Sequence, residues 1–234
     1  MNREILEENI YYYPDAIKDP QKLVEIIEKT DLGDYGSSIG KWSDWDSCSG
    51  QMYNYGTEKI LYPTEEEMSK PAEDNDISYM FHIINDAFYN VCKDYAVSKG
   101  DMDEPNYYPV FPIKKYKAGT FMGAHFDQQE GDKRLRYSLV MYLNDDYEGG
   151  ELSFTIKSPD APIIEGKPDE DFDIAKEKTP ELLTVSIKPK AGSVVIFPSS
   201  PPYHHTAHLV KSGAKYMVPT HWMHEGIAAP NQSM

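Results

Sequence analysis

Cysteine is scarce in this chain, and the scarcity excludes a fold stapled by disulfides. Only two cysteines, Cys48 and Cys92, occur among 234 residues. A disulfide-stapled fold usually carries four or more at compatible spacings. We therefore expect both to be reduced thiols, as in most proteins that work inside cells.

Long apolar runs are absent as well. No stretch approaches the roughly 18 apolar residues that a membrane-spanning helix needs. The N-terminal segment MNREILEENI is charged and lacks the apolar centre of a signal peptide. These two absences predict a soluble, intracellular protein of the cytoplasm that has no membrane partner.

Basic residues are few relative to acidic ones. The chain has 23 Lys and Arg against 39 Asp and Glu, a formal net charge of −16. Proteins that bind a nucleic-acid backbone present basic surface to its phosphates, so the balance disfavours nucleic acid as a partner. An acidic surface with Tyr- and Trp-containing loops would suit a basic or neutral peptide.

The length is compatible with a single domain over residues 1–234. Its first part, 1–108, is predicted to supply helical support and loops. Apolar residues recur at helical spacing over 75–98, and a second helix is expected to begin at Asp19-Pro20 and to end near Gly33. The segments between these helices are predicted to be loops: 34–56, an irregular loop or a lid over the substrate, and 58–74, a loop with a short helical turn.

From Pro109 onward the pattern changes to short apolar runs with a period of two residues. Many short strands separated by turns are typical of a β-sandwich or barrel, which we place at 109–226. A proline-rich, acidic segment, 157–183, interrupts it as an insertion. The predicted strands are 110–111, 113–116, 120–127, 135–143, 151–156, 182–187, 193–197, 205–210 and 215–222.

The stretch YKAGTFMGAHFD ends in a His-X-Asp pair, His125 and Asp127. Side chains two residues apart on a strand point to the same face, so an extended stretch would place both on one side. One imidazole and one carboxylate make up two thirds of a 2-His-1-carboxylate site, the arrangement that binds mononuclear Fe(II) with open positions.

The residues alone leave the second histidine open. The spacing His204-His205-X-X-His208 also raises the possibility of a zinc cluster. Structural zinc sites use four protein ligands, often cysteines, and both cysteines are distant in sequence, so we favour iron. The candidates for the second histidine are His204, His205, His208, His221 and His224.

An ordered set of motifs runs over residues 110–224. The motifs are Tyr116-X-X-Gly119, His125-X-Asp127, Tyr142-Leu143-Asn144, Gly149-Gly150-Glu151-Leu152, Pro189-Lys190-X-Gly192, Phe197-Pro198 and His205…Val210-X-X-Gly213-X-Lys215-Tyr216. This set resembles the prolyl 4-hydroxylase-like branch of the 2-oxoglutarate- and Fe(II)-dependent dioxygenases. The resemblance implies a mainly β fold with supporting helices and a double-stranded β-helix (jelly-roll, cupin-like) core. It also implies Fe(II), 2-oxoglutarate as co-substrate, O2, and ascorbate as a reductant.

The resemblance also assigns the site residues. In that branch the second histidine ligand precedes a basic residue by ten positions, which selects His205 ahead of Lys215. His204 is one position out of register and, in a strand, would face the other way. The implied metal ligands are His125, Asp127 and His205; the implied co-substrate contacts are Lys215, which pairs with the distal carboxylate, and Tyr116, Tyr142 and Ser138.

Hydroxylation is the activity that the resemblance favours, because similar enzymes that halogenate carry Ala or Gly at the position of Asp127. We expect a prolyl residue in a peptide or protein as substrate, with release of succinate and CO2. Met122 stands where the branch often has an aromatic residue, which puts a prolyl-shaped pocket in question. The alternatives are a small-molecule substrate, a nucleic-acid oxygenase of the same superfamily, and a non-catalytic metal-binding barrel.

Overall fold

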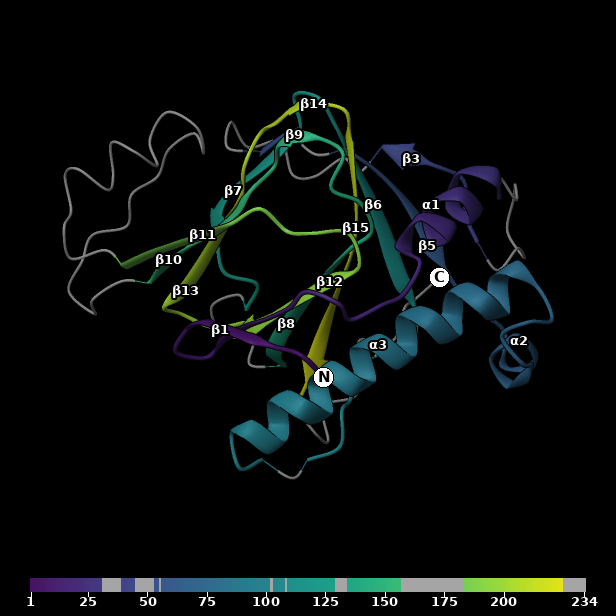
Figure 1. Cartoon of the computed structure of the whole chain (residues 1–234), viewed down its shortest axis with the longest axis horizontal. Helices are drawn as coiled ribbons and strands as arrows, with labels where there is room; N and C mark the ends of the chain where they lie inside the picture. The colour runs from purple at the N-terminus through teal and green to yellow at the C-terminus, as the bar shows by residue number, and fades with distance from the viewer. Residues whose placement is uncertain are drawn as a thin grey trace.

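The computed structural model describes residues 1–30, 39–44, 53–54, 56–101, 103–107, 109–128, 134–156 and 183–224. In these residues the chain forms two facing β-sheets, with helices on the outer side of the larger sheet (Figure 1). The predictions for 157–182 of the insertion and for most of the 34–56 loop lie outside the described residues. No helix in the described part of the chain is long and apolar enough to cross a membrane.

Two antiparallel sheets and a two-stranded ribbon contain the strands. In spatial order the larger sheet consists of β1 (Glu4–Glu7), β2 (Ile10–Tyr13), β12 (Ser193–Pro198), β8 (Leu135–Tyr142), β15 (Ala214–Met223), β6 (Phe111–Lys117), β5 (Thr57–Leu61) and β3 (Ser43–Asp44). The smaller sheet consists of β11 (Leu183–Ile187), β10 (Leu152–Ile156), β13 (Tyr203–Ala207), β7 (Phe121–His125) and β4 (Tyr53–Asn54). The ribbon pairs β14 (Val210–Ser212) with β9 (Glu148–Gly149).

Successive strands of the core alternate between the two sheets. The chain passes from β6 to β7 to β8 and later from β12 to β13 to β15, crossing from one sheet to the other each time. This alternation is the winding of a double-stranded β-helix, a double-sheet jelly roll. The predicted fold, mainly β with supporting helices, is confirmed.

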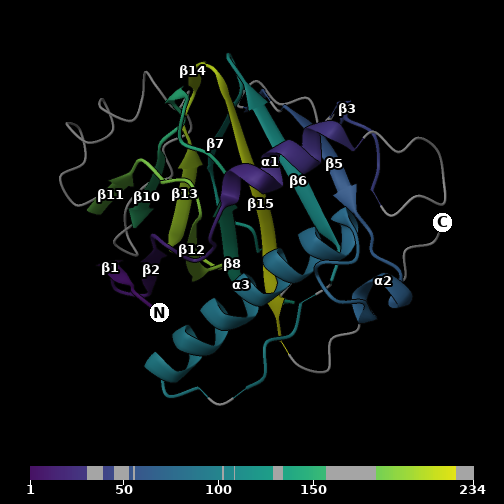
Figure 2. The same cartoon turned by 45° about the vertical axis from the view of Figure 1, so that its right-hand side comes forward.

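The helices support the larger sheet from outside. α1 (Pro20–Lys29) and α3 (Asp76–Ser98) lie across its outer face, and α2 (Glu65–Ser69) is a short turn before α3 (Figure 2). The Asn75 side chain accepts a hydrogen bond from the Ser78 amide at 2.9 Å and caps α3 at the predicted start. α1 also begins as predicted but ends before Gly33, because Thr30 is extended and its amide and hydroxyl both donate to the Ile26 carbonyl.

The predictions for 58–74 and for 205–210 were wrong in part. β5 lies where 58–74 was expected to begin as a loop, because Lys59 breaks the apolar pattern although it is buried. Its ammonium donates to the carbonyls of Ile27 and Thr30 at 2.8 and 2.9 Å, and these hydrogen bonds cap the C-terminal end of α1. The strand expected over 205–210 instead leaves the smaller sheet after β13 and continues as β14.

The apolar core forms two layers. One layer packs α1 and α3 against the outer face of the larger sheet, and the other fills the space between the sheets. Successive side chains of β2 belong to different layers: Tyr11 and Tyr13 point toward α3, while Tyr12 points into the space between the sheets. The inner layer contains Tyr116, Tyr142, Tyr147, Leu152, Phe154 and Phe197, and it surrounds the candidate site.

Candidate metal centre

His125 and His205 lie side by side on neighbouring strands of the smaller sheet. The antiparallel register of β7 and β13 places the two residues directly opposite each other, and their ring centroids are 4.1 Å apart. Phe197 packs against the His205 ring with centroids 4.7 Å apart. Pairing of the strands therefore brings together two histidines that are 80 positions apart in sequence.

Asp127 completes the group from a bend and not from a strand. β7 ends at His125, so the expected extension of the strand to Asp127 was wrong. Phe126 packs edge-on against His204 with centroids 5.0 Å apart, and the Gln128 amide donates to the Ser199 carbonyl at 2.9 Å. These contacts turn the chain so that the Asp127 carboxylate still faces the histidines.

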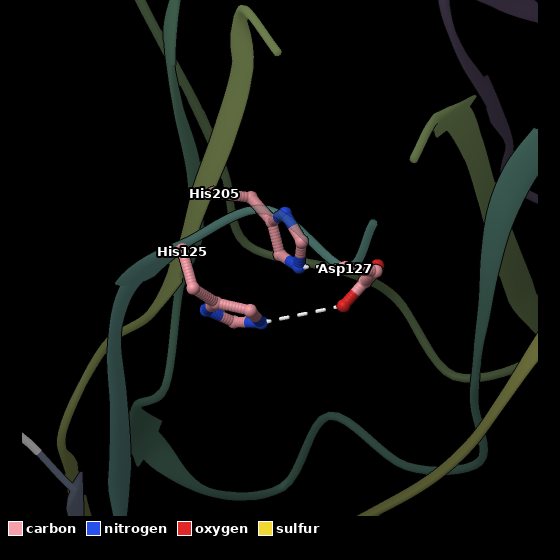
Figure 3. Close-up of side chains that lie close together, drawn as sticks. All are labelled: His125, Asp127 and His205. Carbon is pink, nitrogen blue, oxygen red and sulfur yellow. Dashed lines mark ion pairs between the residues drawn. The ribbon is translucent and has the colours of Figure 1, made fainter. Parts of the chain in front are cut away.

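The three side chains converge on one point (Figure 3). His125 Nε2 is 3.5 Å from Asp127 Oδ1, and His205 Nε2 is 3.7 Å from Asp127 Oδ2. One ligand atom from each residue lies within 4.8 Å of the others. Two imidazole nitrogens and one carboxylate oxygen on one side are the donor set of a mononuclear Fe(II) site with open positions.

Backbone carbonyls orient both imidazoles toward that point. His125 Nδ1 lies 2.7 Å from the Gly123 carbonyl, and His205 Nδ1 lies 3.5 Å from the Tyr203 carbonyl. A carbonyl oxygen only accepts, so each Nδ1 carries the proton and donates it. Each Nε2 then presents its lone pair to the centre, the tautomer that a metal ligand requires.

The protonation states also suit a divalent cation. Burial, reinforced by the neighbouring His125, lowers the pKa of His205 to about 3, so its imidazole is neutral at neutral pH. Burial alone would raise the pKa of Asp127, but interactions with His205, His125 and His221 outweigh it and hold that pKa well below its usual value. A neutral His205 imidazole and an ionised Asp127 carboxylate bind a metal without first releasing protons, so these residues fit Fe(II).

The other candidate histidines do not belong to this group of three. His204 faces Phe126, and His208 Nε2 lies 2.7 Å from the Ser153 hydroxyl. His221 approaches Asp127 from the larger sheet, while His224 is exposed just beyond β15. Cys92 is buried on α3 in the outer core layer. Among the described residues, the group within ligand distance contains three side chains and no cysteine, which favours iron over a closed zinc site.

Lys215 lies in the inner layer as a buried cation. Its side chain is 0% exposed, and its Nζ donates to the Gly150 carbonyl at 2.7 Å. Burial, together with the charge of Lys188, lowers the pKa of Lys215 to about 7. Within the described part of the chain no carboxylate forms an ion pair with it. A buried ammonium in this state has donors to spare for a bound anion.

Aromatic residues surround that ammonium. Lys215 Nζ lies 5.0 Å from the ring centroid of Tyr142 and 5.8 Å from that of Tyr147. The Tyr147 hydroxyl is buried, and no partner for it occurs among the described residues. Tyr116 belongs to the same layer, with its hydroxyl 3.9 Å from Met122 Sδ. A cation and an unpaired hydroxyl in an apolar layer fit the distal carboxylate of a 2-oxo dicarboxylic acid.

Ser138 lies on β8 of the larger sheet, whereas His125 and His205 lie on β7 and β13 of the smaller sheet. Its hydroxyl donates to Asp127 Oδ2 and lies 2.8 Å from the hydroxyl of Ser199. The predicted contact of Ser138 with the co-substrate stays a prediction. Tyr147 and Ser199 were not assigned to the site from sequence, although each follows a recognised motif, Tyr142-Leu143-Asn144 and Phe197-Pro198. His221 was a candidate for the second histidine ligand but was not selected.

Comparison with known proteins supports the same chemistry. A family model described as the 2OG-Fe(II) oxygenase superfamily matches residues 111–224, which contain the three converging side chains and Lys215. This match confirms the resemblance at the level of the superfamily and, with it, Fe(II), 2-oxoglutarate and O2 as the cofactors. None of the curated proteins matches this sequence.

Several solved structures share the fold at low sequence identity. A viral collagen prolyl hydroxylase from Paramecium Bursaria Chlorella virus-1, solved as a 2OG complex, is 18% identical with a TM-score of 0.53, over 92% of this chain and 96% of that one. A prolyl hydroxylase from Trichoplax adhaerens, bound to a hypoxia inducible factor peptide, is 11% identical with a TM-score of 0.54, over 92% and 83%. The non-heme alpha ketoglutarate dependent carbocyclase SnoK from nogalamycin biosynthesis is 14% identical with a TM-score of 0.54, over 92% and 79%.

Proposed function

We propose that this chain, whose residues 111–224 belong to the 2OG-Fe(II) oxygenase superfamily, hydroxylates a prolyl residue in a peptide or protein. The observation that carries the proposal is the convergence of His125, Asp127 and His205 on one point. Lys215 supports it as a buried cation in the same inner layer as Tyr142 and Tyr147.

The three converging residues would hold the iron. Bound there with 2-oxoglutarate and O2, Fe(II) supplies the chemistry that inserts one oxygen atom into a C–H bond and the other into succinate, with loss of CO2. His125 and His205 would contribute Nε2 donors, and Asp127 would contribute a negative charge. The three residues would leave one side of the metal for the co-substrate and O2.

Lys215 would hold the co-substrate at its far end. A carboxylate taken into an apolar layer is stable only when paired with a cation and hydrogen-bonded. Lys215 provides the cation, and the Tyr147 hydroxyl is available as a second donor. The aromatic rings of the inner layer exclude water around this pair and so strengthen the attraction.

Two observations support a peptide substrate. Two of the structural neighbours are prolyl hydroxylases, one of them with a bound peptide fragment. The chain's net charge of −16 favours a basic or neutral peptide over a nucleic acid. The carbocyclase neighbour is evidence that the same fold also serves other oxidative reactions, so the substrate has to be tested directly.

The test is turnover on a peptide array. Proline-containing peptides with basic and with acidic flanks are incubated with Fe(II), 2-oxoglutarate and O2, and their masses are compared. We expect wild-type protein to add the mass of one oxygen atom to a subset with basic or neutral flanks, whereas His205→Ala adds none. Production of succinate with a small molecule but with no peptide would contradict the prolyl substrate and leave the oxygenase chemistry in place.

A further inference from the structure

His221 approaches the Asp127 carboxylate from the sheet opposite the histidine ligands. It lies on β15 of the larger sheet, and its Nε2 is 3.5 Å from Asp127 Oδ2. Its side chain is 35% exposed. Its register partner on β8 is Ser138, whose hydroxyl donates to the same oxygen. Two neighbouring strands of the larger sheet thus direct polar side chains at one carboxylate oxygen.

The two oxygens of Asp127 have different surroundings. Oδ1 lies nearest His125, at 3.5 Å from its Nε2. Oδ2 accepts from Ser138 and has the nitrogens of His221 and His205 at 3.5 and 3.7 Å. His221 itself does not belong to the group of ligand atoms that lie within 4.8 Å of one another in the described residues. His221 therefore contacts the carboxylate and does not reach the metal position.

We propose that His221 is a positioning residue that donates its Nε2–H to Asp127 Oδ2 and so leaves Oδ1 alone to bind iron. This inference rests on the proposed function, since it assigns a role at the same metal centre. Ser138 is the second donor to Oδ2, and together the two donors fix the carboxylate from outside. Groups that orient a metal ligand in this way typically set its affinity and its geometry.

The physical reason lies in the open positions of the site. Carboxylates bind metals through one or both oxygens. A carboxylate that swung round to bind through both would occupy a position needed by the co-substrate or O2. Donors held on Oδ2 oppose that rotation, because it would break their hydrogen bonds, and the buried Ser138 hydroxyl could not replace its bond with one to water. His221 thus keeps Asp127 in one-oxygen binding.

Metal affinity tests this role without any turnover. Metal-free wild-type protein, His221→Leu and His221→Gln are titrated with Mn(II), and free Mn(II) is counted by its electron paramagnetic resonance signal. We expect His221→Leu to bind Mn(II) about tenfold more weakly, the lower end of the effect of losing such a partner. His221→Gln should recover most of the affinity, since its amide N–H can donate to the same oxygen.

The matched control is His224→Leu, which removes an exposed histidine just beyond the same strand and should leave Mn(II) binding unchanged. His221→Ala repeats the test if the leucine variant fails to fold. Wild-type affinity in His221→Leu, or equal weakness in the leucine and glutamine variants, would overturn the inference. If that happens while wild-type protein with Fe(II) and 2-oxoglutarate forms its charge-transfer band, the proposed function stands. Wild-type protein that binds no Mn(II) would overturn both.

Discussion

The Lys215 ammonium donates a hydrogen bond to the Gly150 carbonyl at 2.7 Å, and this contact ties β15 to the segment between β9 and β10. Gly150 has a φ of +66°, and a Cβ at this position would lie 2.8 Å from the Tyr147 ring and 3.3 Å from Lys215 Cδ. A glycine is thus needed here for both its backbone conformation and its small size. The three residues lie together at the place where we propose that the distal carboxylate binds.

Binding of 2-oxoglutarate should weaken as the pH rises above about 7. Burial lowers the pKa of Lys215 to about 7, so above that pH the free site has lost its proton. The distal carboxylate needs the charged form, and binding must then take up a proton. Linkage predicts up to about a tenfold loss of affinity per pH unit. Calorimetric titration of the Mn(II)-loaded protein with 2-oxoglutarate at several pH values measures this loss of affinity.

Lys215→Arg is the control for that pH dependence. Arginine keeps its charge throughout this range, so its affinity for 2-oxoglutarate should stay nearly flat with pH, whatever its absolute value. Equal slopes for wild type and Lys215→Arg would show that another group causes the dependence. A wild-type affinity that does not change between about pH 6 and 9 would contradict the assignment of Lys215.

Tyr147→Phe should act in opposite directions on binding and on stability. Losing one hydrogen bond to the co-substrate costs about 0.5–1.5 kcal/mol, or roughly two- to thirteenfold in affinity. The free protein should unfold less readily, since the variant removes a buried hydroxyl that has no partner among the described residues. Calorimetry and urea unfolding measure the two effects.

The control for Tyr147→Phe is Tyr62→Phe, which removes a hydroxyl from a side chain that is 41% exposed. Neither affinity nor stability should change in that variant. Unchanged 2-oxoglutarate affinity in Tyr147→Phe would exclude its hydroxyl from the co-substrate pocket.

Asn144→Ala should destabilise the fold by roughly 2–6 kcal/mol. The buried amide of Asn144 donates to the Ala214 carbonyl at 2.7 Å and accepts from the Tyr216 amide at 2.7 Å, on both sides of Lys215. The substitution leaves two backbone groups, the Ala214 carbonyl and the Tyr216 amide, without this hydrogen-bond partner, at a cost of about 1–3 kcal/mol each. Urea unfolding measures the change. Asn106→Ala, which removes a more exposed bond of 3.3 Å, should cost under about 1 kcal/mol, and a comparable loss in both variants would contradict the account.

The sequence predicts most of the core because its strands alternate regularly and its turns are marked by Gly and Pro. The strands over 135–143, 151–156, 193–197 and 215–222 have counterparts in β8, β10, β12 and β15 within a residue or two at each end. The helix over 75–98 likewise matches α3. These elements bury one continuous face, and that periodicity is visible in the sequence.

The sequence predictions failed where a residue lies in an environment that is unusual for its type. Lys59 is hydrophilic yet buried, since its charge closes the end of α1, and the strand around it was taken for a loop. The His-X-Asp pair was expected on one strand face, whereas Asp127 reaches the site from a bend. Tyr147 and His221 are ordinary residues in sequence, and only the crossing of the two sheets brings them to the site.

The charge-transfer band tests the central claim most directly. Fe(II) and 2-oxoglutarate are added without oxygen to wild type, His205→Ala and His204→Ala, and the weak visible metal-to-ligand band is recorded. His204 is the matched control, because it neighbours His205 in sequence and faces Phe126 instead of the centre. The structure predicts the band in wild type and His204→Ala and its loss in His205→Ala. A folded wild-type protein without the band, or a band that survives His205→Ala and disappears in His204→Ala, would contradict the assigned metal centre.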